Sequence, residues 1–170
     1  MTLAWSSGCR NSHSHSPALI GVYLLADVGS IAGGWLSSHF IKRGWSTNRA
    51  RKTTLLIAAL CAVPMVGVVS APNPMVAVLV IGLGTAAHQA FSSNIFTMIT
   101  DLYPRRAVAT IAGMGGAAGS VGGILIAQAT GWTLELTGSY LPIVIYAGLA
   151  YLLALGAIQL LVPRMEPAPV

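Results

Sequence analysis

The sequence predicts an all-α integral membrane protein with five transmembrane helices. Of its 170 residues, 55% are hydrophobic and 8% are charged, and the mean hydropathy is +0.74. An ordinary soluble domain carries about a quarter charged residues. Crossing a bilayer takes a helix of about 20 residues. Five apolar runs reach about that length: residues 18–40, 53–71, 75–99, 107–130 and 141–162. Each run is expected to be helical, because an open strand would leave backbone groups unsatisfied in lipid.

Charged residues and prolines separate the five runs. The breaks read "KRGWSTNRARK", "APNP", "DLYPRR" and "GWTLELTGSY". Residues 1–17 are predicted to be a polar leader outside the membrane, since they lack the apolar segment of a secretory signal. Residues 163–170 are predicted to be a cytoplasmic tail.

No cofactor, metal ion or disulfide is expected. His13 and His15 stand two residues apart in a polar leader, where a solvated tail is the simpler interpretation than a metal-binding tract. Cys9 belongs to the leader and Cys61 to the second apolar run, so the two thiols are predicted to stay apart.

The placement of the basic residues predicts the topology. The net charge is +5, and lysine and arginine are confined to alternate breaks within 18–170: Lys42, Arg43, Arg49, Arg51, Lys52, then Arg105 and Arg106, then Arg164. By the positive-inside rule, the first and third breaks and the C-terminus are cytoplasmic. This pattern favours a multi-pass protein of the plasma (inner) membrane, and it argues against a nucleic-acid partner.

The five runs divide into two kinds. The second and fifth are apolar nearly all round, which predicts contact with lipid, and Pro64 is expected to bend the second. The first carries a polar stripe, the third has a polar centre, and the fourth has Gly115, Gly119 and Gly123 along one side. Three helices are therefore predicted to build an interior that two others enclose. Gly119→Leu is accordingly expected to be more damaging than Gly148→Leu.

Three stretches carry a specific resemblance: "LADVGSIAGGWLSSHFIKRGWSTNRARK", "AHQAFSSNIFTMITDLYPRRAVATIAGMGGAAGSVGG" and "TGSY...LLVPRMEP". Residues 18–167 resemble the C-terminal half of major facilitator superfamily transporters, in the anion:cation symporter branch that includes hexuronate and aldonate transporters. The resemblance implies a partial C-terminal bundle, helices 8 to 12 of a twelve-helix fold, in which helices 8, 10 and 11 line a central cavity. The family's basic loop motif is altered, because Ser38 and His39 follow Gly34 where an acid and an arginine would stand.

Asp27 lies near the middle of the first run, where an ionised carboxylate costs about 3 kcal/mol on insertion scales. One interpretation makes Asp27 a cavity-lining or proton-responsive group. The other makes it a hydrogen-bonding group between helices, packed by neighbouring glycines. The choice stays open at this point.

The third run supplies the candidates for substrate binding, Gln89, Ser92, Ser93 and Asn94. Neutral amides and hydroxyls suit the hydroxyl groups of a sugar acid without the cost of a buried charge. The alternative is that these groups bond to neighbouring helices. His88 is interpreted as structural, and Tyr23 is a weaker cavity candidate.

These features predict a fragment of a proton-coupled secondary transporter for small organic acids such as hexuronates. It would contribute one side of a central cavity, be inactive alone, and depend on a missing N-terminal half, protons and the lipid bilayer. The alternative is a non-transporting integral membrane remnant or interaction partner. An enzyme is not expected, because the sequence has no HExxH, GxSxG, paired carboxylates or phosphate-binding loop.

Overall fold

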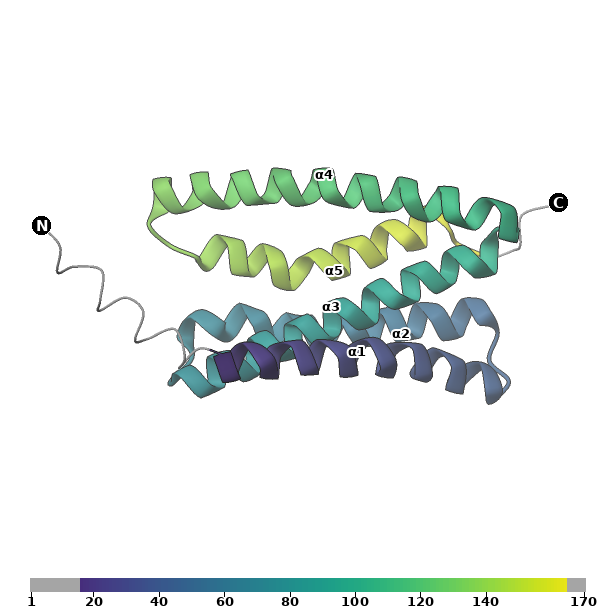
Figure 1. The fold of residues 1–170 in the computed structure, drawn as a ribbon, viewed down its shortest axis with the longest axis horizontal. Coiled ribbons are helices and arrows are strands. Elements are labelled where there is room, and N and C mark those ends of the chain that lie inside the picture. Colours follow the sequence, from purple (N-terminus) through teal and green to yellow (C-terminus); the bar gives the residue numbers. More distant parts are fainter. Residues whose placement is uncertain (1–15, 165–170) are drawn as a thin grey trace, which may run out of the picture.

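A computed structural model describes residues 16–164, and within them the chain is a bundle of long helices with no strand. Each helix runs antiparallel to the one before it (Figure 1). The elements in chain order are α1 (Ser16–Lys42), α2 (Thr47–Ala62), the 3₁₀ helix η2 (Val63–Ser70), α3 (Pro74–Leu102), α4 (Arg105–Thr137) and α5 (Leu141–Leu161). Five of these stretches, with α2 and η2 counted together, are long and apolar enough to cross a membrane. The predicted fold class is confirmed. The predictions for the leader, with Cys9, His13 and His15, fall outside the described residues.

Two helices extend well beyond the predicted apolar runs. Helix α2 begins at Thr47 rather than residue 53, because the Ser46 side chain caps it by accepting a hydrogen bond from the backbone N–H of Arg49. Helix α4 continues to Thr137 rather than residue 130. It ends at Gly138, whose φ of 62° is the left-handed conformation that glycine adopts without strain. Most residues of the first and fourth expected breaks are therefore helical.

At Pro64, where a bend was predicted, the structure shows a change of helix type. The α-helix ends at Ala62, and the chain continues as 3₁₀ helix from Val63 to Ser70. Proline has no N–H to donate and its ring clashes with the carbonyl four residues earlier, so it disfavours continuation of the α-helical pattern.

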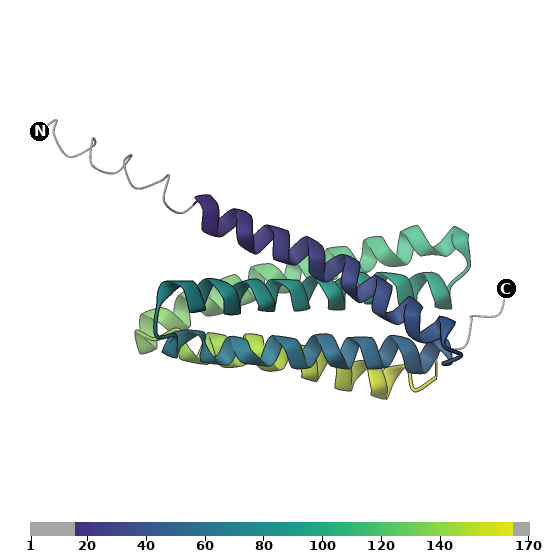
Figure 2. The same ribbon diagram turned by 90° about the horizontal axis from the view of Figure 1, so that it is seen from below.

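Helices α1 and α3 pack together through small residues. A β-carbon added at Gly33 would lie 2.7 Å from the Cα atom of Ala90, and one added at Gly29 would overlap the backbone of Ala86. The missing side chains thus let the two backbones approach closely. Seen from below, α1 crosses the bundle obliquely and diverges from α2 away from the turn that joins them (Figure 2).

Burial within the described residues does not follow the predicted division into three interior and two enclosing helices. Helix α2 has a buried face, and its Leu55, Ala58 and Ala59 form a core with Phe91 and Met98 of α3. Helix α5 packs against that core through Tyr151, Leu152, Ala154, Leu155 and Ile158. Helix α4, by contrast, has no buried residue. The physical reason is that an apolar side chain suits lipid and a helix interface equally well, so apolarity did not distinguish them.

Packing within the described residues favours the opposite order for the two glycine substitutions. A β-carbon added at Gly119 would meet no atom within 4 Å. One added at Gly148, which is buried on α5, would lie 2.6 Å from Cγ2 of Val66. Gly148 therefore has the tighter surroundings among the described residues.

Candidate functional site

Two polar side chains of α1 are exposed. Tyr23 is 70% exposed, and Asp27 is exposed and has no hydrogen-bond partner among residues 16–164. At 100° per residue, Asp27 lies about 140° around α1 from Ala32, which faces α2. Asp27 therefore projects from the side of α1 that is turned away from α2, and it does not act as an interhelical hydrogen-bonding group in this arrangement.

Gln89 and Ser92 extend this polar surface onto α3. Both side chains are half-buried, and neither forms a hydrogen bond with another described residue. Ser92 lies about 140° around the helix from Ala87, which faces α2. The amide and hydroxyl groups are therefore on the same side of the α1 and α3 pair as Asp27. Together Tyr23, Asp27, Gln89 and Ser92 are called the polar face below.

Two of the other candidates are engaged in helix packing. The Ser93 hydroxyl donates to the carbonyl of Ala90 at 3.1 Å and reaches that of Ser30 on α1 at 3.5 Å. Asn94 is fully buried, and its amide nitrogen donates to the carbonyl of Ala90 at 2.9 Å. Its Oδ1 atom has no partner among the described residues. Ser93 and Asn94 are thus separated from the polar face by the rotation of α3.

His88 joins α3 to α5. Its Nδ1 atom lies 2.8 Å from the hydroxyl oxygen of Tyr151, and the ring of Tyr151 also meets the edge of Phe91. The two polar rings border a cavity of about 380 Å³ between α3, α4, α5 and η2. This contact agrees with a structural role for His88, and it places the residue away from α1.

A polar contact at one end of the bundle was not anticipated from the sequence. The Arg51 side chain on α2 is 7% exposed, and its Nε donates to Oδ2 of Asp101 on α3 at 2.9 Å. Its Nη1 donates to the hydroxyl of Ser37 on α1 at 2.6 Å. One guanidinium group therefore ties three helices together. The sequence did contain a signal for this contact. Arg51 comes just before the second apolar run and Asp101 just after the third, so both are predicted at the cytoplasmic side of the membrane.

All the lysines and arginines among residues 16–164 lie at this same end. They are at the α1–α2 turn and the start of α2, at the start of α4, and after α5 (Figure 1). Lys52 additionally donates to the carbonyls of Val162 at 2.6 Å and Pro163 at 2.9 Å, which secures the C-terminal end of α5. The polar face itself therefore combines a carboxyl, a phenol, an amide and a hydroxyl without a cation from the described helices.

The described residues contain no group of three histidine, cysteine or acidic side chains placed to hold a metal ion. Cys61 carries a free thiol. The polar face is suited to hydrogen bonding with a hydroxylated solute.

Similarity to curated proteins agrees with this chemistry. The chain is 32% identical over 139 residues to the hexuronate transporter of Escherichia coli strain K12, covering 79% of the chain and 31% of that transporter. It is 25% identical over 144 residues to the D-galactonate transporter of Escherichia coli O6:H1, covering 81% of the chain and 33% of the relative. An uncharacterized transporter of Bacillus subtilis, YybO, is 29% identical over 135 residues, covering 78% of the chain and 31% of the relative.

No protein-family profile matches the sequence. The chain spans about a third of the length of the curated relatives it matches. The resemblance inferred from the sequence is nevertheless confirmed by three named transporters. Over about four fifths of its length, this chain is similar to a hexuronate transporter and a D-galactonate transporter.

Proposed function

We propose that the five helices form one side of the central cavity of a proton-coupled carrier for small organic acids such as hexuronates. The observation that carries the proposal is the polar face: Tyr23 and Asp27 on α1 lie on the same side of the α1 and α3 pair as Gln89 and Ser92, within mainly apolar spans. Polar groups at membrane depth are costly unless they meet protein, water or a solute. A substrate cavity supplies that environment.

The chemistry of the polar face suits part of a sugar acid. The Gln89 amide and the Ser92 hydroxyl can both donate and accept, which matches the hydroxyl groups of the solute. The substrate's carboxylate requires a cation, and the described basic residues are all at one end of the bundle. In this proposal the cation comes from the opposing half of the carrier, and Asp27 takes part in proton coupling.

The proposal assigns the chain to the plasma (inner) membrane with its C-terminus in the cytoplasm. The basic end of the bundle would face the cytoplasm, as the positive-inside rule requires. Alternating access needs one bundle to rock against another around a shared site. Five helices supply one wall, so the 170-residue chain is proposed to carry out no coupled transport alone.

A chimeric carrier tests this proposal. The first seven helices of the hexuronate transporter of Escherichia coli would be joined ahead of α1, and uptake of radiolabelled hexuronate measured in cells without an endogenous carrier. The chimera is expected to show saturable, pH-dependent uptake, and the chain alone none. Gln89→Ala should raise the apparent KM about fivefold, the equivalent of one hydrogen bond of about 1 kcal/mol.

Gln159→Ala is the matched control, because Gln159 is an exposed glutamine on α5, far along the chain from the polar face. It is expected to leave KM unchanged, and Asp27→Asn is expected to alter the pH dependence of uptake. Equal effects of the two glutamine variants would contradict the placement of the cavity. Uptake by the chain alone would contradict the need for a second bundle, and no uptake by a folded chimera would favour the non-transporting alternative.

A further inference from the structure

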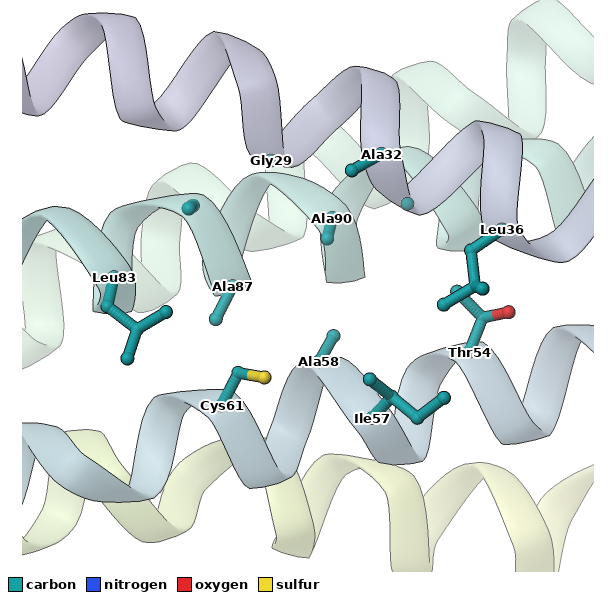
Figure 3. A pocket seen from close by; sticks show the side chains of 12 residues that line it. Gly29, Ala32, Leu36, Thr54, Ile57, Ala58, Cys61, Leu83, Ala87 and Ala90 are labelled. Carbon is teal, nitrogen blue, oxygen red and sulfur yellow. The ribbon is translucent and has the colours of Figure 1, made fainter.

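A narrow apolar groove lies between α1 and α2, with α3 as its floor. It has a volume of about 170 Å³, and Figure 3 shows the side chain of Leu36 beside Thr54 and the side chains of Ala58 and Ala90 directed toward each other. Its hydroxyl-bearing residue, Thr54, already donates to the carbonyl of Ala50 at 2.9 Å. An apolar cavity of about 150 Å³ is large enough to hold a benzene ring. The groove therefore fits a segment of hydrocarbon chain and offers no site for a polar solute.

The turn that joins the two walls of the groove carries exposed positive charge. Lys42, Arg43 and Arg49 are all exposed there. The single carboxylate at this end of the described bundle, Asp101, is already paired with Arg51. Three positive charges are thus available to an anionic ligand at the turn.

Aromatic rings at the same turn mark a membrane interface. Trp45 stacks on Phe40 with 4.7 Å between ring centroids, and the Arg49 guanidinium lies 4.4 Å from the centroid of the Trp45 ring. Tryptophan side chains favour the headgroup level of a bilayer. The turn therefore lies at the depth where lipid headgroups are found.

We propose that this groove and turn bind one anionic phospholipid, with an acyl chain between α1 and α2 and the phosphate on Lys42, Arg43 and Arg49. Leu36 is about 10 Å along the helix from Arg43, a distance that an acyl chain spans easily. The hydrogen bond from Arg51 to Ser37 joins α2 to α1 at a point between the groove and the turn. The groove-lining residues Ala32 and Ile57 are exposed, so the acyl chain enters the groove sideways from the bilayer.

Native mass spectrometry of the detergent-solubilised 170-residue chain tests the assignment, with phosphatidylglycerol and phosphatidylcholine of identical acyl chains as probes. Each basic residue near an anionic lipid strengthens attraction about fivefold, so phosphatidylglycerol should bind on the order of 100-fold more tightly. The preference should shrink as ionic strength rises. Equal binding of the two lipids by the unaltered chain would overturn the proposal without any variant.

Two variants separate the headgroup from the acyl chain. The triple substitution of Lys42, Arg43 and Arg49 by glutamine should abolish the preference, whereas the same change at Arg105, Arg106 and Arg164, which are also exposed, should keep it. Ala32→Phe, at an exposed position on the groove wall, should weaken binding of both lipids. Three outcomes would each refute the site. They are an equal loss of the phosphatidylglycerol preference in the two triple variants, no effect of Ala32→Phe on lipid binding, and retention of a second copy of the chain in place of lipid.

Discussion

The close packing of α1 on α3 makes a sharp prediction about two neighbouring glycines. Gly33 faces α3, and a β-carbon there would lie 2.7 Å from the Cα atom and 2.8 Å from the Cβ atom of Ala90. Gly34 is the next residue of the same helix, and a β-carbon there would meet no atom within 4 Å. Gly33→Ala and Gly34→Ala therefore make the same chemical change in different surroundings.

The magnitudes follow from these distances. Ordinary contacts between carbon atoms are about 3.5–4.0 Å, so Gly33→Ala requires the two helices to move apart by about 1 Å. Overpacking of this kind costs about 1–3 kcal/mol. Both variants gain about 1 kcal/mol of helix propensity, because alanine replaces glycine, and that gain cancels in the comparison. Gly34→Ala should therefore be more stable than Gly33→Ala by about 1–3 kcal/mol.

Unfolding of each purified variant in mixed micelles, titrated with sodium dodecyl sulfate and followed by circular dichroism, measures this difference. We expect the Gly34→Ala midpoint to lie above that of the unaltered chain and the Gly33→Ala midpoint to lie at or below it. Equal midpoints for the two variants would show that α1 does not pack on α3 through Gly33.

Three further outcomes are expected. Gly148→Leu should lower the free energy of unfolding by about 1–3 kcal/mol more than Gly119→Leu, because Val66 crowds Gly148 and no atom lies close to Gly119. The reverse order would support the division of helices expected from the sequence. Asp101→Asn should cost about 1.5–3 kcal/mol by weakening a charged hydrogen bond to a buried arginine, whereas Glu135→Gln, at an exposed residue, should cost nothing measurable in the same titration. Reporter fusions in the α1–α2 and α4–α5 turns should report opposite sides of the membrane, and a common side would contradict the topology.

The sequence predicted the helices well because length and apolarity determine them directly. Backbone groups must be satisfied within the segment itself, so a long apolar run has little alternative to a helix. Length and apolarity along the chain were enough to make this prediction.

Features that depend on a partner far along the chain could not be predicted in this way. Arg51 and Asp101 are 50 residues apart, and each borders an apolar run where a charge is expected for other reasons. Helical periodicity shows which residues share a face, but it does not show what packs against that face. Helix α2 was therefore assigned to lipid although Leu55 lies in the core.

The candidate residues on α3 show the same limit at a finer scale. Ser92 and Ser93 are adjacent and chemically identical, so no feature of the sequence distinguishes their roles. Consecutive residues are about 100° apart around a helix. That rotation directs Ser93 to the carbonyl of Ser30 on α1 and leaves Ser92 on the polar face. The distinction required the position of α1.

Helix α4 carries a second stripe of regularly spaced glycines. Its Gly115, Gly119 and Gly123 have the four-residue spacing that Gly29 and Gly33 have on α1, and such spacing lets a second helix approach closely. The glycines of α1 meet α3, whereas none of the three on α4 would bring a β-carbon within 4 Å of another described atom. The same spacing therefore has different outcomes on the two helices. The stripe on α1 holds α1 against α3, whereas the stripe on α4 makes no such contact among the described residues.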